Sequence, residues 1–190
     1  MHKQSSIELL IIACSAGGVL LLMDLLAALN RQIGFSVLAV VHRNDKFPSS
    51  LEQMAQQKCS LSVKQAEEKE SLAPGVVYFA PAGYHVLIES DKTISLDVSE
   101  PVNYCRPSID VAMQSAAEVY REKLMAILLS GANQDGAEGM RAVYAYGGLT
   151  LVQSPKEAEV DTMPKAAIDT HAIVSILSDE QLKRYCRELV

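Results

Sequence analysis

The sequence predicts an α/β fold with a doubly wound, mostly parallel sheet of the Rossmann-like type and an inserted antiparallel β-hairpin. Short, continuous apolar runs are typical of strands that are covered on both faces. Longer segments with helical spacing follow most of these runs, and such alternation gives a parallel sheet between two layers of helices. The chain has 190 residues, a length typical of one domain. We therefore expect a single domain that spans residues 1–190.

The first third of the chain contains three predicted strands and two predicted helices. The strands are apolar runs, and the helices are bounded by residues that start or stop a helix, such as Gly34 after the first and Ser49 or Ser50 before the second. The expected strands cover residues 9–13, 36–41 and 60–65, and the expected helices cover residues 19–29 and 51–57.

The pattern changes between residues 76 and 97. Three short strands, at 76–80, 85–89 and 93–97, are separated by turn-forming residues that include Pro81 and Gly83. Short strands with turns at this spacing are typical of antiparallel pairing. This segment therefore predicts the inserted hairpin.

After Pro107 the alternation of helices and strands resumes. Pro107 fits the first turn of a helix that runs to about Lys123. The remaining strands are expected at 124–129, 149–152 and 172–177, and the remaining helices at 135–146, 164–170 and 178–189, the last with Ser178 as its cap.

Composition excludes several classes of protein. Hydrophobic residues make up 49% of the chain, which excludes a disordered protein. The net charge of −6 argues against nucleic acid as a partner. The apolar N-terminal stretch is interrupted by Glu8, Asp24 and a pair of glycines, so we expect neither a signal peptide nor membrane insertion.

The cysteines predict a reducing environment. All four lie far apart, at Cys14, Cys59, Cys105 and Cys186, and none forms a CxxC pair. This spacing is typical of reduced thiols in the cytoplasm. We expect no metal site and no cofactor.

Three loops that directly follow strongly apolar strands can carry the chemistry. In doubly wound sheets, ligands and catalytic groups gather at the carboxyl ends of the strands. These loops supply Ser15, His42 and Asp135. A histidine can remove the proton of a serine hydroxyl near neutral pH, and a carboxylate can fix the histidine tautomer. The three residues are therefore a candidate nucleophilic triad.

Simpler interpretations remain open at this point. Ser15 could cap the following helix, or its glycine-rich turn could hold a phosphate. His42 could be a structural histidine, and Asp135 could be a helix cap. Asp45 and Asp110 are rival candidates for the acid of a triad.

Six motifs in order resemble the catalytic domain of the CheB protein-glutamate methylesterases of bacterial chemotaxis. The resemblance runs from about residue 7 to residue 177. The motifs are ACSAGG at 13–18, VVH at 40–42, PGVVYFAPAGYH at 74–85, RPSID at 106–110, LSGANQDGAEGM at 129–140 and MPKAA at 163–167.

The resemblance implies a serine hydrolase that removes methyl esters from glutamate side chains of chemoreceptors, releases methanol and also deamidates glutamines. The substrate would be a methylated chemoreceptor or a similar helical signalling protein. The nucleophile, base and acid of the family fall on Ser15, His42 and Asp135. Residues expected to form the oxyanion site or line the substrate cleft are Ala16, Gly17, His85 and Ala132.

The sequence also departs from the family pattern. Ala16, Val41, Arg43-Asn44 and Ala132-Asn133 stand where other residues are usual. Only about six residues precede the first predicted strand, whereas typical members carry an N-terminal receiver domain. We therefore expect a stand-alone enzyme, a fragment, or a subunit controlled by a regulator in trans. A catalytically degenerate binding or regulatory module is the alternative.

Overall fold

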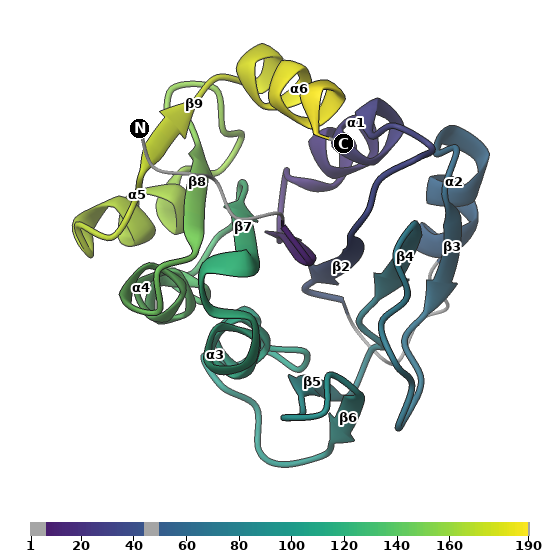
Figure 1. The fold of residues 1–190 in the computed structure, drawn as a ribbon. Helices are drawn as coiled ribbons and strands as arrows, with labels where there is room; N and C mark the ends of the chain where they lie inside the picture. Colours follow the sequence, from purple (N-terminus) through teal and green to yellow (C-terminus); the bar gives the residue numbers. More distant parts are fainter. Residues whose placement is uncertain (1–6, 44–49, 190) are drawn as a thin grey trace.

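The main sheet has seven parallel strands, and a separate pair of strands forms an antiparallel hairpin (Figure 1). The computed structural model of the protein describes residues 7–43 and 50–189. The strand order in the main sheet is β3-β4-β2-β1-β7-β8-β9, and β5 pairs with β6. The strands are β1 (Leu9–Cys14), β2 (Ser36–Val41), β3 (Ser62–Gln65), β4 (Val76–Phe79), β5 (His85–Ile88), β6 (Ile94–Asp97), β7 (Leu124–Leu128), β8 (Leu149–Gln153) and β9 (Ser175–Leu177).

The helices form two layers, one on each face of the main sheet (Figure 1). Helices α3, α4 and α5 and the β5-β6 hairpin pack on one face, while α1, α2 and α6 pack on the other. Their bounds are α1 (Val19–Ala28), α2 (Leu51–Lys58), α3 (Ile109–Tyr120), α4 (Ala137–Ala145), α5 (Thr162–Asp169) and α6 (Asp179–Glu188), and a 3₁₀ turn (Arg121–Lys123) follows α3.

The central strands are buried because both faces of the sheet are covered. Every residue of β1, β2 and β7 is buried. Successive side chains of β1 enter opposite core clusters, Leu9 and Ile11 on the α3 side and Leu10 and Ile12 on the α1 side. This confirms the predicted doubly wound sheet, since alternation with no polar face requires two apolar layers.

The assignment of residues 76–80 to the turn-rich hairpin segment needs correction. Only β5 and β6 pair as an antiparallel hairpin, and β4 lies in the main sheet between β3 and β2. The physical reason is burial on both faces. Val77 and Phe79 enter one core cluster and Tyr78 the other, so β4 satisfies the rule for a central parallel strand.

Two predicted helix starts also differ from the structure. Ser108, not Pro107, begins α3, because its hydroxyl accepts a hydrogen bond from the Val111 backbone N–H. Ser50 precedes α2 but makes no side-chain capping bond, and Ser49 lies outside the described residues. The Ser178 cap of α6 is confirmed and forms a capping box with Gln181.

Strand order places three loops at one edge of the sheet. β1 lies between β2 and β7, so the loops after these three strands meet where the chain direction across the sheet reverses. Such a switch point is where open α/β sheets bind ligands. The loops carry Ser15, His42 and Asp135.

Gly136 gives a stability prediction for the loop that follows β7. It has a positive φ of 101°, and a Cβ there would meet Leu128 Cδ1 at 2.8 Å. Gly136→Ala should therefore lower the free energy of unfolding by about 1–3 kcal/mol, measured by urea denaturation. Gly34→Ala is the control, because a Cβ at Gly34 meets nothing within 4 Å. Equal shifts in the two variants would contradict this account of the loop.

Candidate active site

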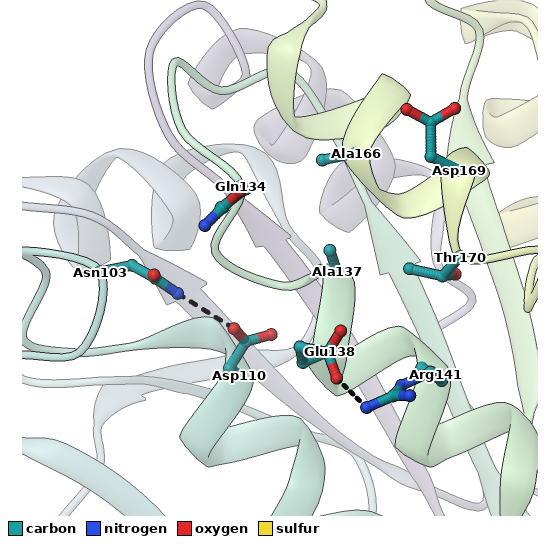
Figure 2. A pocket seen from close by; sticks show the side chains of 9 residues that line it. All are labelled: Asn103, Asp110, Gln134, Ala137, Glu138, Arg141, Ala166, Asp169 and Thr170. Carbon is teal, nitrogen blue, oxygen red and sulfur yellow. Dashed lines mark hydrogen bonds and ion pairs between the residues drawn. The ribbon is translucent and has the colours of Figure 1, made fainter.

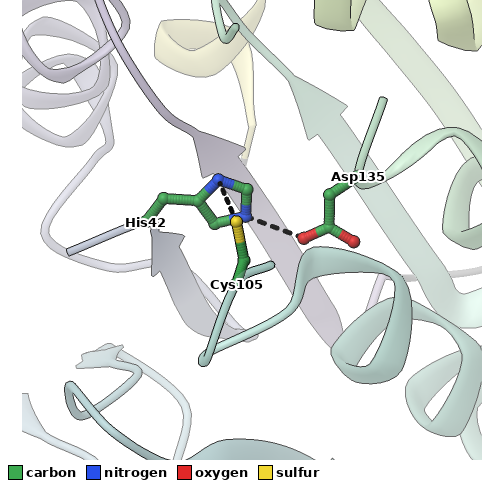
Figure 3. A group of neighbouring side chains, drawn as sticks. All are labelled: His42, Cys105 and Asp135. Carbon is green, nitrogen blue, oxygen red and sulfur yellow. Dashed lines mark hydrogen bonds and ion pairs between the residues drawn. The ribbon is translucent and has the colours of Figure 1, made fainter. Parts of the chain in front are cut away.

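The centre of the site is a hydrogen bond between His42 and Asp135. His42 directly follows β2, and Asp135 lies in the loop between β7 and α4. His42 Nε2 and Asp135 Oδ2 are 2.7 Å apart. The His42 side chain is 9% exposed, whereas that of Asp135 is fully buried. The structure therefore brings two of the three predicted triad residues into direct contact (Figure 3).

The Asp135 carboxylate lies at the N-terminus of α3. It accepts hydrogen bonds from the backbone N–H groups of Ile109 at 2.6 Å and Asp110 at 3.1 Å, and from the Ser108 hydroxyl at 2.8 Å. Burial acts to raise the pKa of Asp135, but the bond from His42 and these donors outweigh burial and lower it. Asp135 is therefore ionised and can hold the Nε2–H form of the imidazole. It does not cap α4, because Gly136 occupies that position.

With Nε2 committed to Asp135, Nδ1 is the ring nitrogen left for proton transfer. Nδ1 lies 3.3 Å from the sulfur of Cys105, as Figure 3 shows. Burial acts to lower the pKa of His42, but the bonds to Asp135 and Cys105 outweigh it and raise the pKa to about 9. The histidine is therefore a strong base once it is neutral.

Ser15 lies beside this pair at the end of β1. Its N–H donates to the Ser130 carbonyl at 2.9 Å, and the N–H of His42 donates to the Cys14 carbonyl at 3.2 Å. Ser15 is half-buried. Within residues 7–43 and 50–189, no hydrogen bond joins the Ser15 hydroxyl to His42. Ser15 does not cap α1, because Gly18 is the cap residue.

Two exposed residues of the loops after β1 and β7 leave their backbone N–H groups without a partner in the described chain. Ala16 and Ala132 are exposed, and their N–H groups donate to no group in the described part of the chain. Gly17, between Ala16 and α1, has a φ of 77°, and a Cβ there would meet Glu159 Cβ at 2.6 Å. The turn after β1 therefore needs glycine at this position.

A second serine contacts the same carboxylate, and a second histidine contacts the backbone of that serine. Ser108, His85 and Asp135 are buried and joined by hydrogen bonds, a set whose composition is consistent with a catalytic triad. The hydroxyl of Ser108 donates to Asp135, whereas His85 Nδ1 accepts from the Ser108 backbone N–H. His85 Nε2 donates to the Glu100 carbonyl at 3.1 Å. His85 thus contacts the backbone that carries Ser108.

A pocket of about 530 Å³ lies next to the acid, between α3, α4 and α5 (Figure 2). Asn103 at its edge donates to Asp110 at 3.2 Å and to Asp135 at 3.5 Å. Glu138 and Arg141 form an ion pair on another side of the pocket. The pocket therefore shares a wall with the candidate active site.

His42, Cys105 and Asp135 are also residue types that bind metals. One potential ligand atom from each lies within 4.8 Å of the others. The Asp135 oxygens already accept five hydrogen bonds from protein groups. The three residues therefore form a chain of hydrogen bonds from Cys105 through His42 to Asp135.

Sequence reasoning missed the contact of Cys105 with His42, and it named Asn133 only as a departure from the family pattern. The Asn133 amide donates to the Cys105 sulfur at 3.2 Å. No spacing signal links position 105 to position 42, so only the fold brings them together.

Of the rivals for the acid, Asp110 contacts the backbone N–H groups of Gly136 and Gly139. Asp45 lies outside the described residues.

The fold and this site define the class of α/β enzymes that place a histidine–carboxylate pair at the carboxyl ends of parallel strands. The chain belongs to the CheB methylesterase family, whose model matches residues 10–186. The crystal structure of the Thermotoga maritima CheB methylesterase catalytic domain superposes with a TM-score of 0.91 and 30% sequence identity. The alignment covers 98% of this chain and 100% of that one.

Curated relatives fall into two size classes. A Leptospira interrogans protein, provisionally named protein-glutamate methylesterase/protein-glutamine glutaminase, is 41% identical over 175 residues, which cover 92% of this chain and 91% of that protein. Protein-glutamate methylesterase/protein-glutamine glutaminase 1 of Carboxydothermus hydrogenoformans is 37% identical over 175 residues, which cover 90% of this chain and 52% of the relative. The chain thus matches nearly all of the first relative and about half of the second.

None of the helices in the described ranges combines the length and apolar character needed to span a membrane.

Replacing the acid tests the His42–Asp135 pair. Asp135→Asn should leave the imidazole in the wrong tautomer and lower kcat by up to about 10⁴-fold. Asp110→Asn should cost less, because Asp110 contacts backbone N–H groups and not the imidazole. Steady-state kinetics of both folded variants measure the difference. If Asp110→Asn is the more damaging change, Asp135 is not the acid.

The pH profile tests His42 as the base. The imidazole must be neutral to accept a proton, and its pKa is about 9, so kcat/KM should rise with pH from neutral towards about 9. Asp135→Asn removes a bond that raises this pKa, so its profile should rise at lower pH. Rates are corrected for spontaneous ester hydrolysis. A profile that is flat over this range would exclude His42 as the base.

Proposed function

We propose that this protein is a protein-glutamate methylesterase that removes methyl esters from glutamate side chains of chemoreceptors and also deamidates glutamines. The observation that carries the proposal is the His42–Asp135 bond of 2.7 Å at the strand edge that also holds Ser15. A base oriented by a buried acid beside an accessible hydroxyl is the arrangement used in nucleophilic ester hydrolysis. The family and the names of the relatives supply the substrate class.

In the proposed mechanism, the Ser15 oxygen attacks the ester carbonyl while Nδ1 of His42 takes the hydroxyl proton. The N–H groups of Ala16 and Ala132 donate to the carbonyl oxygen as it becomes negatively charged. His42 then gives its proton to the leaving methoxide, and methanol departs. Water, activated by His42, hydrolyses the acyl-enzyme. For a glutamine substrate, ammonia leaves in place of methanol.

Ser15 is the better candidate nucleophile than Ser108. The Ser108 hydroxyl is fully buried and donates a hydrogen bond to the Asp135 carboxylate. Its hydrogen-bond partner is therefore the acid of the pair and not the histidine base. Ser15 is half-buried and lies beside exposed backbone donors. We assign Ser108 and His85 to positioning Asp135, and Gly17 to the shape of the substrate cleft.

The remaining assignments follow from the family. We propose that the partner is a methylated chemoreceptor or a similar helical protein and that the protein acts in the cytoplasm. The chain is proposed to form a single catalytic domain. Methanol release from a methylated chemoreceptor, with unmethylated receptor as the blank, tests the activity.

Ser15→Ala should abolish methanol release and labelling by a fluorophosphonate. The free energy of unfolding should change by less than about 0.5 kcal/mol, because the hydroxyl makes no hydrogen bond in the described chain. Ser108→Ala is the matched control. It should lower kcat through Asp135 but keep the fluorophosphonate label.

The opposite pattern of labelling would make Ser108 the nucleophile. A folded wild-type protein that neither labels nor releases methanol would favour the alternative, a catalytically degenerate binding module.

A further inference from the structure

Cys105 forms a second nucleophile–base contact on the same histidine. Its sulfur lies 3.3 Å from His42 Nδ1, and the other ring nitrogen donates to Asp135 at 2.7 Å. In the neutral imidazole Nε2 carries the proton, so Nδ1 has the lone pair that accepts the S–H hydrogen. Figure 3 shows the three side chains in this sequence of contacts. A nucleophile bonded to a base that is oriented by a third group is the arrangement of an activated nucleophile.

The surroundings of Cys105 set it apart from the other thiols. Cys105 is half-buried, whereas Cys14, Cys59 and Cys186 are buried. Burial raises the pKa of both Cys14 and Cys186 to about 12. Buried thiols of this kind are inert towards reagents in solution. Cys105 is therefore the one cysteine that combines access with a base.

A further contact fixes the direction of the Cys105 side chain. The amide of Asn133 donates to the sulfur at 3.2 Å, and the Asn133 side chain also donates to the Asn103 carbonyl at 3.4 Å. Asn133 stands in the loop that carries Asp135. The Cys105 sulfur is thus held between His42 and the loop that carries Asp135.

We propose that Cys105 is a site of covalent modification by soft electrophiles, with His42 as its base. In the reaction with an alkyl halide, the sulfur lone pair forms the S–C bond, and the halide leaves with the electrons of the carbon–halogen bond. The thiol proton passes to Nδ1 of His42 and from there to water. The products are a thioether, a halide ion and the unchanged imidazole.

Modification also blocks the ester hydrolysis. A group attached to the sulfur lies beside Nδ1, the nitrogen that takes the Ser15 proton in the proposed mechanism. The adduct therefore excludes the substrate from the base. This consequence rests on the proposed function, whereas the reactivity of the thiol does not.

Iodoacetamide treatment of the full chain at about pH 9, where about half of the His42 imidazole is neutral, tests the site. Peptide mass spectrometry locates the adduct, and methanol release is followed in parallel. We expect Cys105 to be labelled before the other three cysteines, with activity lost in proportion to labelling. Treated Cys105→Ala protein should release methanol at the same rate as untreated Cys105→Ala protein. Cys186→Ala, which removes a buried thiol, should be labelled at Cys105 at the wild-type rate.

Replacing His42 tests whether the base, and not only the exposure of the Cys105 thiol, makes this thiol reactive. His42→Gln should slow the labelling of Cys105 by roughly 10- to 100-fold. Asp135→Asn should slow it in the same direction, and circular dichroism confirms that each variant is folded. Equal labelling rates in wild type and both folded variants would overturn the proposal, as would earlier labelling of another cysteine.

The activity arm has its own control. If labelled wild-type protein still releases methanol at the untreated rate, the inhibitory consequence is wrong. If untreated protein releases no methanol, the proposed function fails, and the labelling rates alone then decide the assignment of Cys105.

Discussion

The buried carboxylate of Asp135 is the interaction on which the site depends. It joins three segments that are far apart in the sequence: the loop after β7, the residue after β2 and the start of α3. A buried charge without partners would cost several kcal/mol, so the fold must supply donors. The donors are His42, Asn103, the hydroxyl of Ser108 and the backbone N–H groups of Ile109 and Asp110.

A second acid fixes the loop that carries the first. Asp110 accepts hydrogen bonds from the Gly136 and Gly139 N–H groups at 2.8 and 2.7 Å, so it ties the start of α4 to the start of α3. Burial raises the pKa of Asp110 to about 6, and the negative charge of Asp135 adds to the rise. The two buried acids therefore repel each other, but their hydrogen bonds together fix the geometry of the acid and the base. The positive end of the α3 dipole offsets part of the repulsion.

One ring nitrogen connects the two reactivities proposed for this site. Asp135 commits Nε2 of His42, so the Ser15 hydroxyl and the Cys105 thiol both depend on Nδ1. In the structure the thiol contacts this nitrogen, and Ser15 directly follows the neighbouring strand β1. A substrate therefore has to bring the hydroxyl to Nδ1 in place of the sulfur. The chemistry of the thiol and that of the ester are coupled through a single lone pair.

The sequence by itself determined the doubly wound sheet, because short apolar runs such as residues 9–13 are typical of strands covered on both faces and alternate with helical segments. It also placed Ser15, His42 and Asp135 at strand ends, where the topology of parallel sheets gathers catalytic groups. Only the tertiary structure decided that β4 joins the main sheet and that Cys105 contacts the base. Strand partners and side-chain contacts across 63 residues of sequence depend on packing between distant segments, and local periodicity carries no information about such packing.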